Sequence, residues 1–404
     1  MKIGVVGLGY VGLVTAACLA NNGHSVIGID SVPGKVEMLK SGRIPIFEPG
    51  LKEKISAAKS DLVFSTDYAD LAGCSAVFLC VPTPNNGREI DLRYVYEAGD
   101  SVAHYAYDSS LVIKSTVLPG TARKVSAMIG MNVISNPEFT REGSAIHDTE
   151  HPDRIVIGGK STEVVRKIWE FTGAPMVITT NENAELIKYA SNAFLAVKIS
   201  FINQIADLCE AIPNTDVNVI ARGMGLDHRI GTEFLKAGLG YGGSCFPKDT
   251  VALTTFAEEN NIDLSIIRSA IEYNDNRIPN LASKITEKSN SLSGKRVCVL
   301  GLSFKDDTDD LRESRSLLLI ENLESRGAIV NAYDPAVKTA KGVTISSDLQ
   351  NCITSSEIVI TATEWKDFSN LDPELLKGKR VFDLRRILDP DEVDITMGVG
   401  IGKN

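Results

Sequence analysis

The chain has 404 residues, of which 43% are hydrophobic and 23% are charged, a composition typical of a soluble globular protein with two or three domains. The formal net charge of −10 argues against general affinity for nucleic acid or an anionic membrane, so an anionic ligand needs a locally basic pocket. No apolar run reaches the roughly 18 residues that a membrane helix needs. Because the sequence enters an expected strand at once, we do not expect a signal peptide.

Seven cysteines are scattered along the chain without a CxxC pair, and several lie in apolar, strand-like runs. This pattern predicts reduced thiols, no metal site and a cytoplasmic protein.

The first half alternates short β-branched runs with helical stretches, which predicts a parallel sheet wrapped by helices. The expected strands are Lys2–Gly7, Ser25–Asp30, Ala76–Val81, Ser110–Ser115, Met131–Ser135, Arg154–Gly158 and Met176–Thr179.

A GxGxxG fingerprint, formed by Gly7, Gly9 and Gly12 with Tyr10 and Val11, lies between the first expected strand and a helix rich in Ala and Leu. The glycines permit a tight turn, and the helix N-terminus offers N–H groups to a pyrophosphate.

Asp30 ends the second strand 18 residues beyond Gly12, where a carboxylate binds ribose hydroxyls and repels a 2′-phosphate. This predicts NAD rather than NADP. Lys35 weakens the preference slightly, because a lysine there is able to contact either group.

Apolar residues spaced mostly three to five apart predict one long helix from Glu185 to about Ile212, a length that suits a rod between two domains or two subunits. Lys188 and Asn192 lie four residues apart and share a face of this helix. From this segment alone, Lys188 is equally well explained as an exposed surface lysine or as a catalytic one.

The segment GYGGSCFPKD, residues 240–249, places three glycines just before Cys245 and two charged residues, Lys248 and Asp249, just after it. The glycines let a ligand approach the main chain, and a nearby lysine favours the thiolate. We therefore interpret Cys245 as a nucleophile. A nicotinamide cofactor and a thiolate together suit oxidation of an alcohol through an aldehyde and a thioester to an acid.

The last third of the chain repeats the first. Lys295–Phe304, Ala328–Pro335 and Ser356–Trp365 parallel the first strands and turns of the amino-terminal half, which predicts a second α/β domain. This copy lacks the third fingerprint glycine, so it is not expected to bind a second dinucleotide, although Lys305, Arg312 and Arg315 suggest an anion site. The Asn- and Ser-rich stretch Asn274–Ser293 is interpreted as a linker.

The predicted fold is therefore α/β, with two Rossmann-like doubly wound domains joined by a central long helix and a helical dimerisation region. We expect an NAD-binding domain at residues 1–182, a central helical domain carrying Lys188 and Cys245 at 183–285, and a second Rossmann-like domain at 286–404.

Six segments carry a resemblance to a known family. GLGYVGL, STVLPGT, NPEFTREG, PDRIVIGG, GYGGSCFPKD and FKDDTDDLRESRS occur in this order and span most of the chain. Together they resemble the UDP-glucose/GDP-mannose dehydrogenase family, NAD-dependent enzymes that oxidise the sugar of a nucleotide sugar. The resemblance implies a homodimer, catalytic roles for Lys188 and Cys245 in the central domain, a UDP-sugar-binding domain at 286–404, and a UDP-glucose substrate oxidised to UDP-glucuronate.

The resemblance also implies roles for single residues. Cys245 matches the thiolate nucleophile, and Lys188, Asn192 and Asp249 match residues that hold water, stabilise an oxyanion and assist proton removal. Thr116 matches a threonine that orients this water, and Glu138 matches the base for thioester hydrolysis. The implied cofactor contacts are Gly7, Gly9, Tyr10, Val11, Gly12, Asp30, Lys35, Val81, Pro82, Thr83, Thr116, Glu142, Lys248 and Arg312.

The implied substrate contacts are Glu138, Phe139, Glu142, Lys188, Asn192, Arg229, Lys236, Tyr241, Gly242, Phe304, Lys305 and Arg385. Arg229 resembles an arginine contributed across a dimer interface. Leu384 stands where the family commonly has glycine, which makes the role of Arg385 less secure than that of Lys305.

Three alternatives remain at this point. A GDP-mannose or UDP-N-acetyl-hexosamine dehydrogenase would use the same chemistry on another sugar. A two-electron hydroxyacid dehydrogenase would share the first domain but have no use for Cys245. A non-catalytic nucleotide sensor would have no need of Lys188, Cys245 or Asp249.

Overall fold

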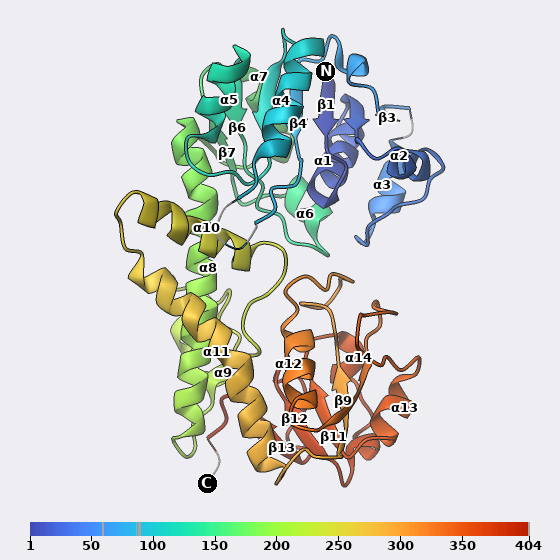
Figure 1. Cartoon of the computed structure of the whole chain (residues 1–404), viewed down its shortest axis with the longest axis vertical. Coiled ribbons are helices and arrows are strands. Elements are labelled where there is room, and N and C mark those ends of the chain that lie inside the picture. The colour runs from blue at the N-terminus through green and yellow to red at the C-terminus, as the bar shows by residue number, and fades with distance from the viewer. Residues whose placement is uncertain (59, 86, 88–89, 403–404) are drawn as a thin grey trace. The chain divides into compact units, whose positions relative to one another are not determined.

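The computed structural model describes residues 1–58, 60–85, 87 and 90–402 (Figure 1). It divides into two compact units, Met1–Ser191 and Asn192–Asn404, and each unit has its own parallel sheet and hydrophobic core.

The first unit is built on an eight-stranded sheet in the order β3-β2-β1-β4-β5-β6-β7-β8. Neighbouring strands are parallel except for β6 and β7, which pair antiparallel. The order runs outward in opposite directions from β1 and β4, and this switch point is where open α/β sheets bind ligands. The strands are β1 (Lys2–Val6), β2 (Ser25–Ile29), β3 (Leu62–Ser65), β4 (Ala76–Leu79), β5 (Ser110–Ile113), β6 (Val133–Ser135), β7 (Ile155–Gly158) and β8 (Met176–Thr179).

Seven of these strands were predicted, and β8 has the predicted bounds. The other six were predicted too long: the expected ends Gly7, Asp30, Val81 and Ser115 and the expected starts Met131 and Arg154 lie one or two residues outside the strands. The N–H groups of Gly7 and Asp30 still bond to neighbouring strands, at 2.8 and 3.2 Å. Strand β3 was missed.

Helices cover both faces of this sheet (Figure 1). Alternate residues of β1 and β4 enter different cores, one packed by α1, α2, α3 and α7 and the other by α4 and α5. The helices are α1 (Tyr10–Asn21), α2 (Pro33–Lys40), α3 (Leu51–Ala57), η1 (Tyr68–Leu71), α4 (Arg93–Tyr105), α5 (Thr121–Ile129), α6 (Ala145–Glu150), α7 (Glu163–Trp169), η2 (Glu170–Thr172) and α8 (Asn181–Glu210).

Helix α8 is the long helix expected from the sequence, but it begins at Asn181 rather than Glu185 and ends at Glu210. Its first turn is fastened to β6, because Asn181 Oδ1 accepts from Ser135 N (2.9 Å) and Asn181 Nδ2 donates to Val133 O (3.1 Å). The first unit ends within α8, and the remainder of the helix belongs to the second unit.

The second unit combines helices with a five-stranded parallel sheet in the order β10-β9-β11-β12-β13. The strands are β9 (Arg296–Leu300), β10 (Ile329–Tyr333), β11 (Ile358–Thr361), β12 (Arg380–Asp383) and β13 (Ile395–Gly398). The helices after α8 are α9 (Val217–Gly225), α10 (Phe246–Glu259), α11 (Ser265–Lys288), α12 (Arg315–Glu324), α13 (Leu349–Thr354), α14 (Lys366–Ser369) and η3 (Pro373–Leu376).

The linker expected at Asn274–Ser293 is wrong, because most of this stretch forms the end of α11. Ile278, Leu281 and Ile285 recur at helical spacing and are fully buried, which outweighs the polar composition. The buried Arg277 donates from Nη1 to Asp207 of α8 (2.7 Å) and ties the two helices together.

The internal duplication predicted from sequence is present in the structure. Strand β1 lies between β2 and β4, and β9 lies in the same way between β10 and β11. In each copy an aspartate after the second strand accepts from the glycine turn: Asp30 Oδ2 from Leu8 N (2.9 Å), and Asp334 Oδ2 from Leu302 N (2.7 Å). The chain thus contains two Rossmann-like domains.

The expectation that every cysteine is a reduced thiol is wrong for one pair. Cys298 of β9 and Cys352 of α13 form a disulfide with a Cα–Cα distance of 5.7 Å. They are 54 residues apart in sequence, so spacing gave no sign of the pairing.

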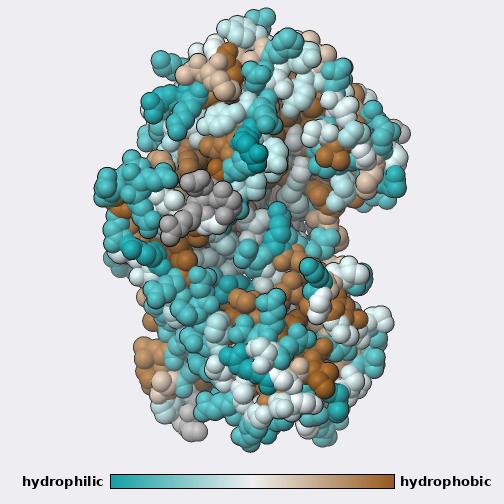
Figure 2. Space-filling model, in the orientation of Figure 1, coloured by the Kyte–Doolittle hydropathy of each residue, from teal (hydrophilic) through white to brown (hydrophobic). Residues whose placement is uncertain are grey.

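No helix in the described part of the chain is long and apolar enough to cross a membrane. On the face drawn in Figure 2, hydrophilic side chains cover most of the surface and apolar side chains form small patches.

Gly12 provides a test of the fingerprint turn. A Cβ at Gly12 would lie 1.8 Å from Gly7 O, whereas a Cβ at Gly9 would meet nothing within 4 Å. Gly12→Ala should lower the free energy of unfolding by at least about 2 kcal/mol, because backbone must move to admit the methyl group. Gly9→Ala should change it by less than about 1 kcal/mol. Urea unfolding followed by circular dichroism measures both, and equal midpoints for the two variants would contradict this packing.

Candidate active site

The fingerprint turn of the first unit has the form that a dinucleotide pyrophosphate needs. Helix α1 begins after Gly9, which contributes no side-chain cap, so N–H groups of its first turn are not capped by a side chain. The space beside Gly9 Cα is open. Gly7 has φ +91°, which favours glycine. These residues fit a dinucleotide on backbone grounds alone.

Asp30 organises the adjoining loop. Its carboxylate accepts from Leu8 N (2.9 Å) and Val32 N (3.0 Å) and pairs with Lys35 Nζ (2.7 Å). Lys35 is thus bound to the very carboxylate predicted to contact the ribose.

Two other predicted cofactor segments lie beside the turn. Val81, Pro82 and Thr83 follow β4, and a Cβ on Gly7 would lie 2.7 Å from the carbonyl oxygen of Cys80. Val81 O in turn accepts from Ser115 Oγ (2.7 Å), which joins this run to the STVLPGT segment.

Tyr10 connects the turn to the segment containing Glu142. Its hydroxyl donates to Glu48 and accepts from Gly143 N (2.7 Å), and Gly143 N also donates to Glu48 Oε2 (2.8 Å). Burial raises the Tyr10 pKa, and the hydrogen bond to Glu48 and the charge of Glu142 raise it further. Sequence reasoning did not identify Glu48.

Glu138 and Lys188 form a buried ion pair, with Glu138 Oε1 at 2.9 Å from Lys188 Nζ. The other oxygen of Glu138 accepts from the backbone N–H (2.7 Å) and the hydroxyl (2.8 Å) of Thr140. Burial alone would raise the pKa of Glu138, but Lys188 and Thr140 outweigh it and lower the pKa to about 2. Glu138 is therefore a carboxylate at neutral pH.

Phe139, a predicted substrate contact, lies between two cations. Its ring centroid is 3.8 Å from Arg154 Cζ and 5.4 Å from Lys188 Nζ. Such contacts fix the ring and the cations relative to one another. Arg154 lies in the PDRIVIGG segment, and the sequence analysis predicted no role for it.

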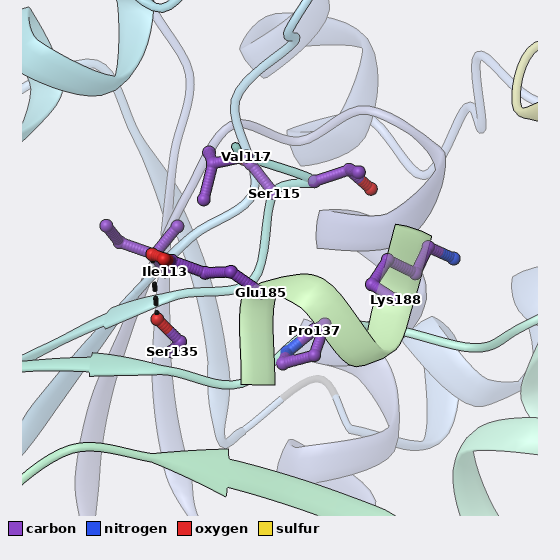
Figure 3. Close-up of a pocket in the computed structure, with 8 residues that line it drawn as sticks. Ile113, Ser115, Val117, Ser135, Pro137, Glu185 and Lys188 are labelled. Carbon is purple, nitrogen blue, oxygen red and sulfur yellow. Dashed lines mark hydrogen bonds between the residues drawn. The ribbon is translucent and has the colours of Figure 1, made fainter. Parts of the chain in front are cut away.

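A small cavity adjoins this ion pair (Figure 3). Its volume of about 10 Å³ is roughly that needed for one water molecule. Polar groups of Thr116, Glu185 and Lys188 line it, which brings together the two predicted residues Thr116 and Lys188. The other lining residues are Ile113, Ser115, Val117, Ser135 and Pro137.

Cys245 occupies the N-cap position of α10 in the second unit, and Pro247 lies in the first turn. A helix N-terminus favours a thiolate over a thiol. Ser244 Oγ lies 3.5 Å from Cys245 Sγ, and Cys245 O accepts from Asp249 N (2.9 Å). The nucleophile interpretation is therefore compatible with the local fold.

Asp249 is buried one turn after Cys245 and is held from two sides. Its Oδ2 accepts from Asn192 Nδ2 (2.6 Å), and its Oδ1 pairs with Lys248 Nζ (2.5 Å). Three residues predicted for the site thus meet in the second unit. Lys248 forms an ion pair with Asp249 in the structure, whereas the sequence analysis assigned Lys248 to the cofactor.

The glycines before Cys245 serve protein packing as well as ligand approach. Gly240 and Gly243 have φ of +96° and +80°. A Cβ on Gly242 would lie 2.2 Å from Glu313 O, and a Cβ on Gly243 would lie 2.7 Å from the Phe304 ring. The predicted substrate residues Gly242 and Phe304 are therefore in one packed group.

Asn274 and Arg315 hold this loop from behind. Asn274 accepts from Tyr241 N (2.9 Å) and donates to Tyr241 O (3.1 Å). Arg315 is buried and donates to the carbonyl oxygens of Leu239 and Asn274. Two of the Arg315 nitrogens are therefore bonded to protein carbonyls, and the anion-site role suggested for Arg315 stays a prediction.

Two predicted substrate cations lie close together. Arg385 Nη1 is 2.9 Å from the Cβ position of Gly238, and Arg385 Nε donates to Ala362 O (2.8 Å). Burial lowers the Arg385 pKa. Lys236 pairs with Glu364 (2.7 Å).

Arg312 and Arg229 instead form exposed pairs with nearby aspartates. Arg312 Nη2 lies 2.5 Å from Asp310, and Arg229 Nη2 lies 2.6 Å from Asp227.

Three family models match the chain in order. They are the NAD binding domain (residues 1–171), the central domain (182–276) and the UDP binding domain (298–390) of the UDP-glucose/GDP-mannose dehydrogenase family.

Individual relatives and solved structures are also similar to this chain over nearly its whole length. The chain is 41% identical to a UDP-glucose 6-dehydrogenase from Rhizobium meliloti (strain 1021), over 97% of each chain. It is similar in structure to a UDP-glucose dehydrogenase from Pyrobaculum islandicum, with a TM-score of 0.93, 37% identity, and coverage of 99% and 98% of the two chains. A UDP-D-ManNAc dehydrogenase from Pyrococcus horikoshii gives a TM-score of 0.89 at 28% identity, with both chains fully covered.

The buried ion pair yields a stability prediction. Lys188→Met leaves Glu138 buried without its cation and should lower the free energy of unfolding at pH 7 by about 3–5 kcal/mol. The pKa of Glu138 is lowered from 4.5 to about 2, so the pair's contribution is present above pH 4.5 and is lost as pH falls toward 2. The difference between wild type and variant should therefore narrow below pH 4.5 in urea unfolding.

The double variant Glu138→Gln/Lys188→Met is the matched control, because it removes both charges. It should be more stable at pH 7 than Lys188→Met alone. If it is less stable, the pair does not account for the loss.

Proposed function

The chain belongs to the UDP-glucose/GDP-mannose dehydrogenase family of NAD-dependent oxidoreductases, and we propose that within this family it oxidises UDP-glucose to UDP-glucuronate in two steps. The names of its UDP-glucose-oxidising relatives, at about 40% identity over nearly the whole chain, support this sugar nucleotide. We assign NAD to residues 1–182, the catalytic Lys and Cys to 183–285, and the UDP moiety to 286–404.

The observation that carries the proposal is the position of Cys245 at the start of α10, one turn before the buried Asp249. An enzyme that oxidises an alcohol only to an aldehyde or ketone needs no thiolate, whereas oxidation to an acid uses one to form a thioester. The placement of Cys245 therefore favours a four-electron oxidation.

In the first step, the C6 hydroxyl of glucose loses its proton and C6 loses a hydride, which gives an aldehyde. Bound NAD supplies the hydride acceptor for both oxidations. Lys188 is paired with the ionised Glu138, so we assign it the charged form, which stabilises the alkoxide. Asn192 lies one helical turn from Lys188 and donates to the oxyanion, and Asp249 assists proton removal through water oriented by Thr116.

In the second step, the Cys245 thiolate attacks the aldehyde carbon and forms a thiohemiacetal. Loss of a second hydride from C6 and of the hydroxyl proton gives a thioester. Water then attacks the thioester carbonyl, Glu138 accepts the proton of this water, and the carbon–sulfur bond breaks to release the acid and the thiolate.

The diphosphate requires cations in an acidic protein. We assign it to Lys305, Arg385 and Lys236. Lys236 belongs to the 236–242 loop, and Arg385 lies against Gly238 of the same loop. Glu142 and Phe139 remain assigned to the substrate, and the cytoplasmic location remains a prediction.

Stoichiometry tests the proposed oxidation. With excess NAD and limiting UDP-glucose, wild type should form two NADH per sugar nucleotide. Cys245→Ser should form at most one, because the oxygen of serine is a poor nucleophile without activation. Absorbance at 340 nm at completion measures both values.

Cys74→Ser is the control, since Cys74 is buried before β4 and has no assigned role. It should behave as wild type. Two NADH from Cys245→Ser would overturn the thioester route, and wild-type activity with only GDP-mannose or a UDP-N-acetyl-hexosamine would change the substrate.

We also propose a homodimer formed through α8. Phe194, Phe201 and Leu208 recur every seven or so residues along this helix and are 64%, 44% and 55% exposed. A repeated row of exposed apolar side chains on one helix face is unfavourable in water and favours a protein partner. Arg229, which lies in the same unit, is then available to the partner's site, as the family resemblance implies.

The dimer is tested by Phe201→Glu/Leu208→Glu. Placing two carboxylates on the apolar row should convert the dimer to a monomer, which light scattering after size exclusion measures directly. Ile262→Glu is the matched control, because Ile262 is similarly exposed (56%) but lies outside α8. A wild-type monomer, or an unchanged mass in the double variant, would contradict the proposal.

A further inference from the structure

A buried glutamate one turn before Lys188 joins three parts of the first unit. Glu185 is only 3% exposed. Its Oε2 accepts from Gly120 N (2.6 Å), and its Oε1 accepts from Ala122 N (2.8 Å) and Ser135 Oγ (3.2 Å). The bond to Ser135 is the dashed line in Figure 3.

Each of these partners leads to a residue assigned to the reaction. Gly120 lies in the STVLPGT segment, residues 115–121, which carries Thr116, and Ala122 follows that segment directly. Ser135 ends β6 and lies three residues before Glu138. Glu185 itself lies three residues before Lys188 on α8, so the two side chains are neighbours on the helix.

The cavity of Figure 3 gives a second, independent observation. Glu185 and Lys188 line it together with Thr116 and Ser135. Glu185 thus lies in the wall of the same small space as Thr116 and Lys188.

We propose that Glu185 is a positioning residue of the dehydrogenase reaction: its ionised carboxylate holds Thr116, Glu138 and Lys188 at their working separation. The proposal rests on the function assigned above. It goes further by naming a residue whose effect is indirect, since Glu185 acts through the segments that it fastens.

The charge of Glu185 matters because both of its oxygens face backbone N–H donors. A proton on either oxygen would oppose one of these donors, so the protonated form holds the segments less tightly. Burial raises the pKa of Glu185, the three hydrogen bonds lower it in part, and the result is about 7.

The charge of Glu182, three residues earlier on α8, raises the pKa of Glu185, and Lys188 lines the same cavity. Arg123 Nε pairs with Glu182 (3.0 Å) at the surface. Because the folded-state pKa of Glu185 lies above its usual value, its ionised form is lost as pH falls through about 7. The pH profile of kcat/KM should therefore have a lower limb near pH 7.

The test is Glu185→Gln in the full-length enzyme. Gln keeps the size of the side chain but turns an NH2 group toward a backbone donor. We expect kcat to fall about 10- to 100-fold, as for displacement of catalytic groups by a fraction of an ångström to an ångström, with the KM for NAD little changed. The limb near pH 7 should disappear, which a purely structural defect would not cause.

Glu182→Gln is the matched control, because it removes a charge from the same helix at an exposed position. It should retain wild-type kcat and a lower limb, displaced slightly to lower pH because the charge of Glu182 raises the pKa of Glu185. Glu185→Asp keeps the charge but is shorter, so it should lose activity while retaining a lower limb.

Hydrogen exchange separates this proposal from the assigned function. Amides in residues 115–123 should exchange faster in Glu185→Gln than in wild type, whatever the sugar. Wild-type inactivity with UDP-glucose would count against the substrate, and kinetics would then use the sugar nucleotide that yields NADH. Unchanged kcat and pH profile, or unchanged exchange, in folded Glu185→Gln would overturn the positioning role.

Discussion

The proposed chemistry depends on side chains carried by one helix. Helix α8 is 30 residues long and carries Lys188 and Asn192 on consecutive turns. Each of these side chains bonds to a buried carboxylate, Lys188 to Glu138 and Asn192 to Asp249. Because helical rise fixes residues four apart at about 6 Å, the register of these groups along α8 is set by the backbone and does not depend on a flexible loop.

The two Rossmann-like domains share an aspartate that holds the glycine turn, but the helices that follow the turns begin differently. In each, an aspartate after the second strand accepts from the glycine turn, which fixes the turn before any ligand is bound. In the first domain the turn opens into α1 with a glycine at its N-cap. In the second, Ser314 caps α12 with its own hydroxyl, so the helix terminus is already satisfied. Both domains thus keep the aspartate that holds the glycine turn, whereas only the second has a side-chain cap at the start of the following helix.

Much of the fold could be predicted from the sequence, because parallel strands and fingerprint turns have characteristic local residue patterns. Most strands of the first domain and most of α8 followed from periodicity, and the second α/β domain followed from the internal repeat. Polar composition predicted a linker where the structure has the end of α11. There the buried Ile and Leu residues at helical spacing determine the structure. The Cys298–Cys352 pair depends on packing between segments 54 residues apart, which no local pattern records.

The same distinction holds for the candidate site. Motifs predicted Lys188, Asn192 and Asp249, which the structure joins to buried partners. Glu48 and Glu185 were missed, because their importance lies in the backbone N–H groups that they accept from, and these belong to distant segments. Sequence spacing also did not show that Lys35 and Lys248 are paired with carboxylates.

The bonds of Asp30 bear on how cofactor preference can evolve in this chain. The carboxylate predicted to disfavour a 2′-phosphate is also the acceptor for Leu8 N and Val32 N and the partner of Lys35. A substitution that removed the negative charge would leave these donors unsatisfied and distort the turn. A lineage moving toward the phosphorylated cofactor must therefore first acquire another acceptor for the loop, so selectivity and folding are inherited together at this position.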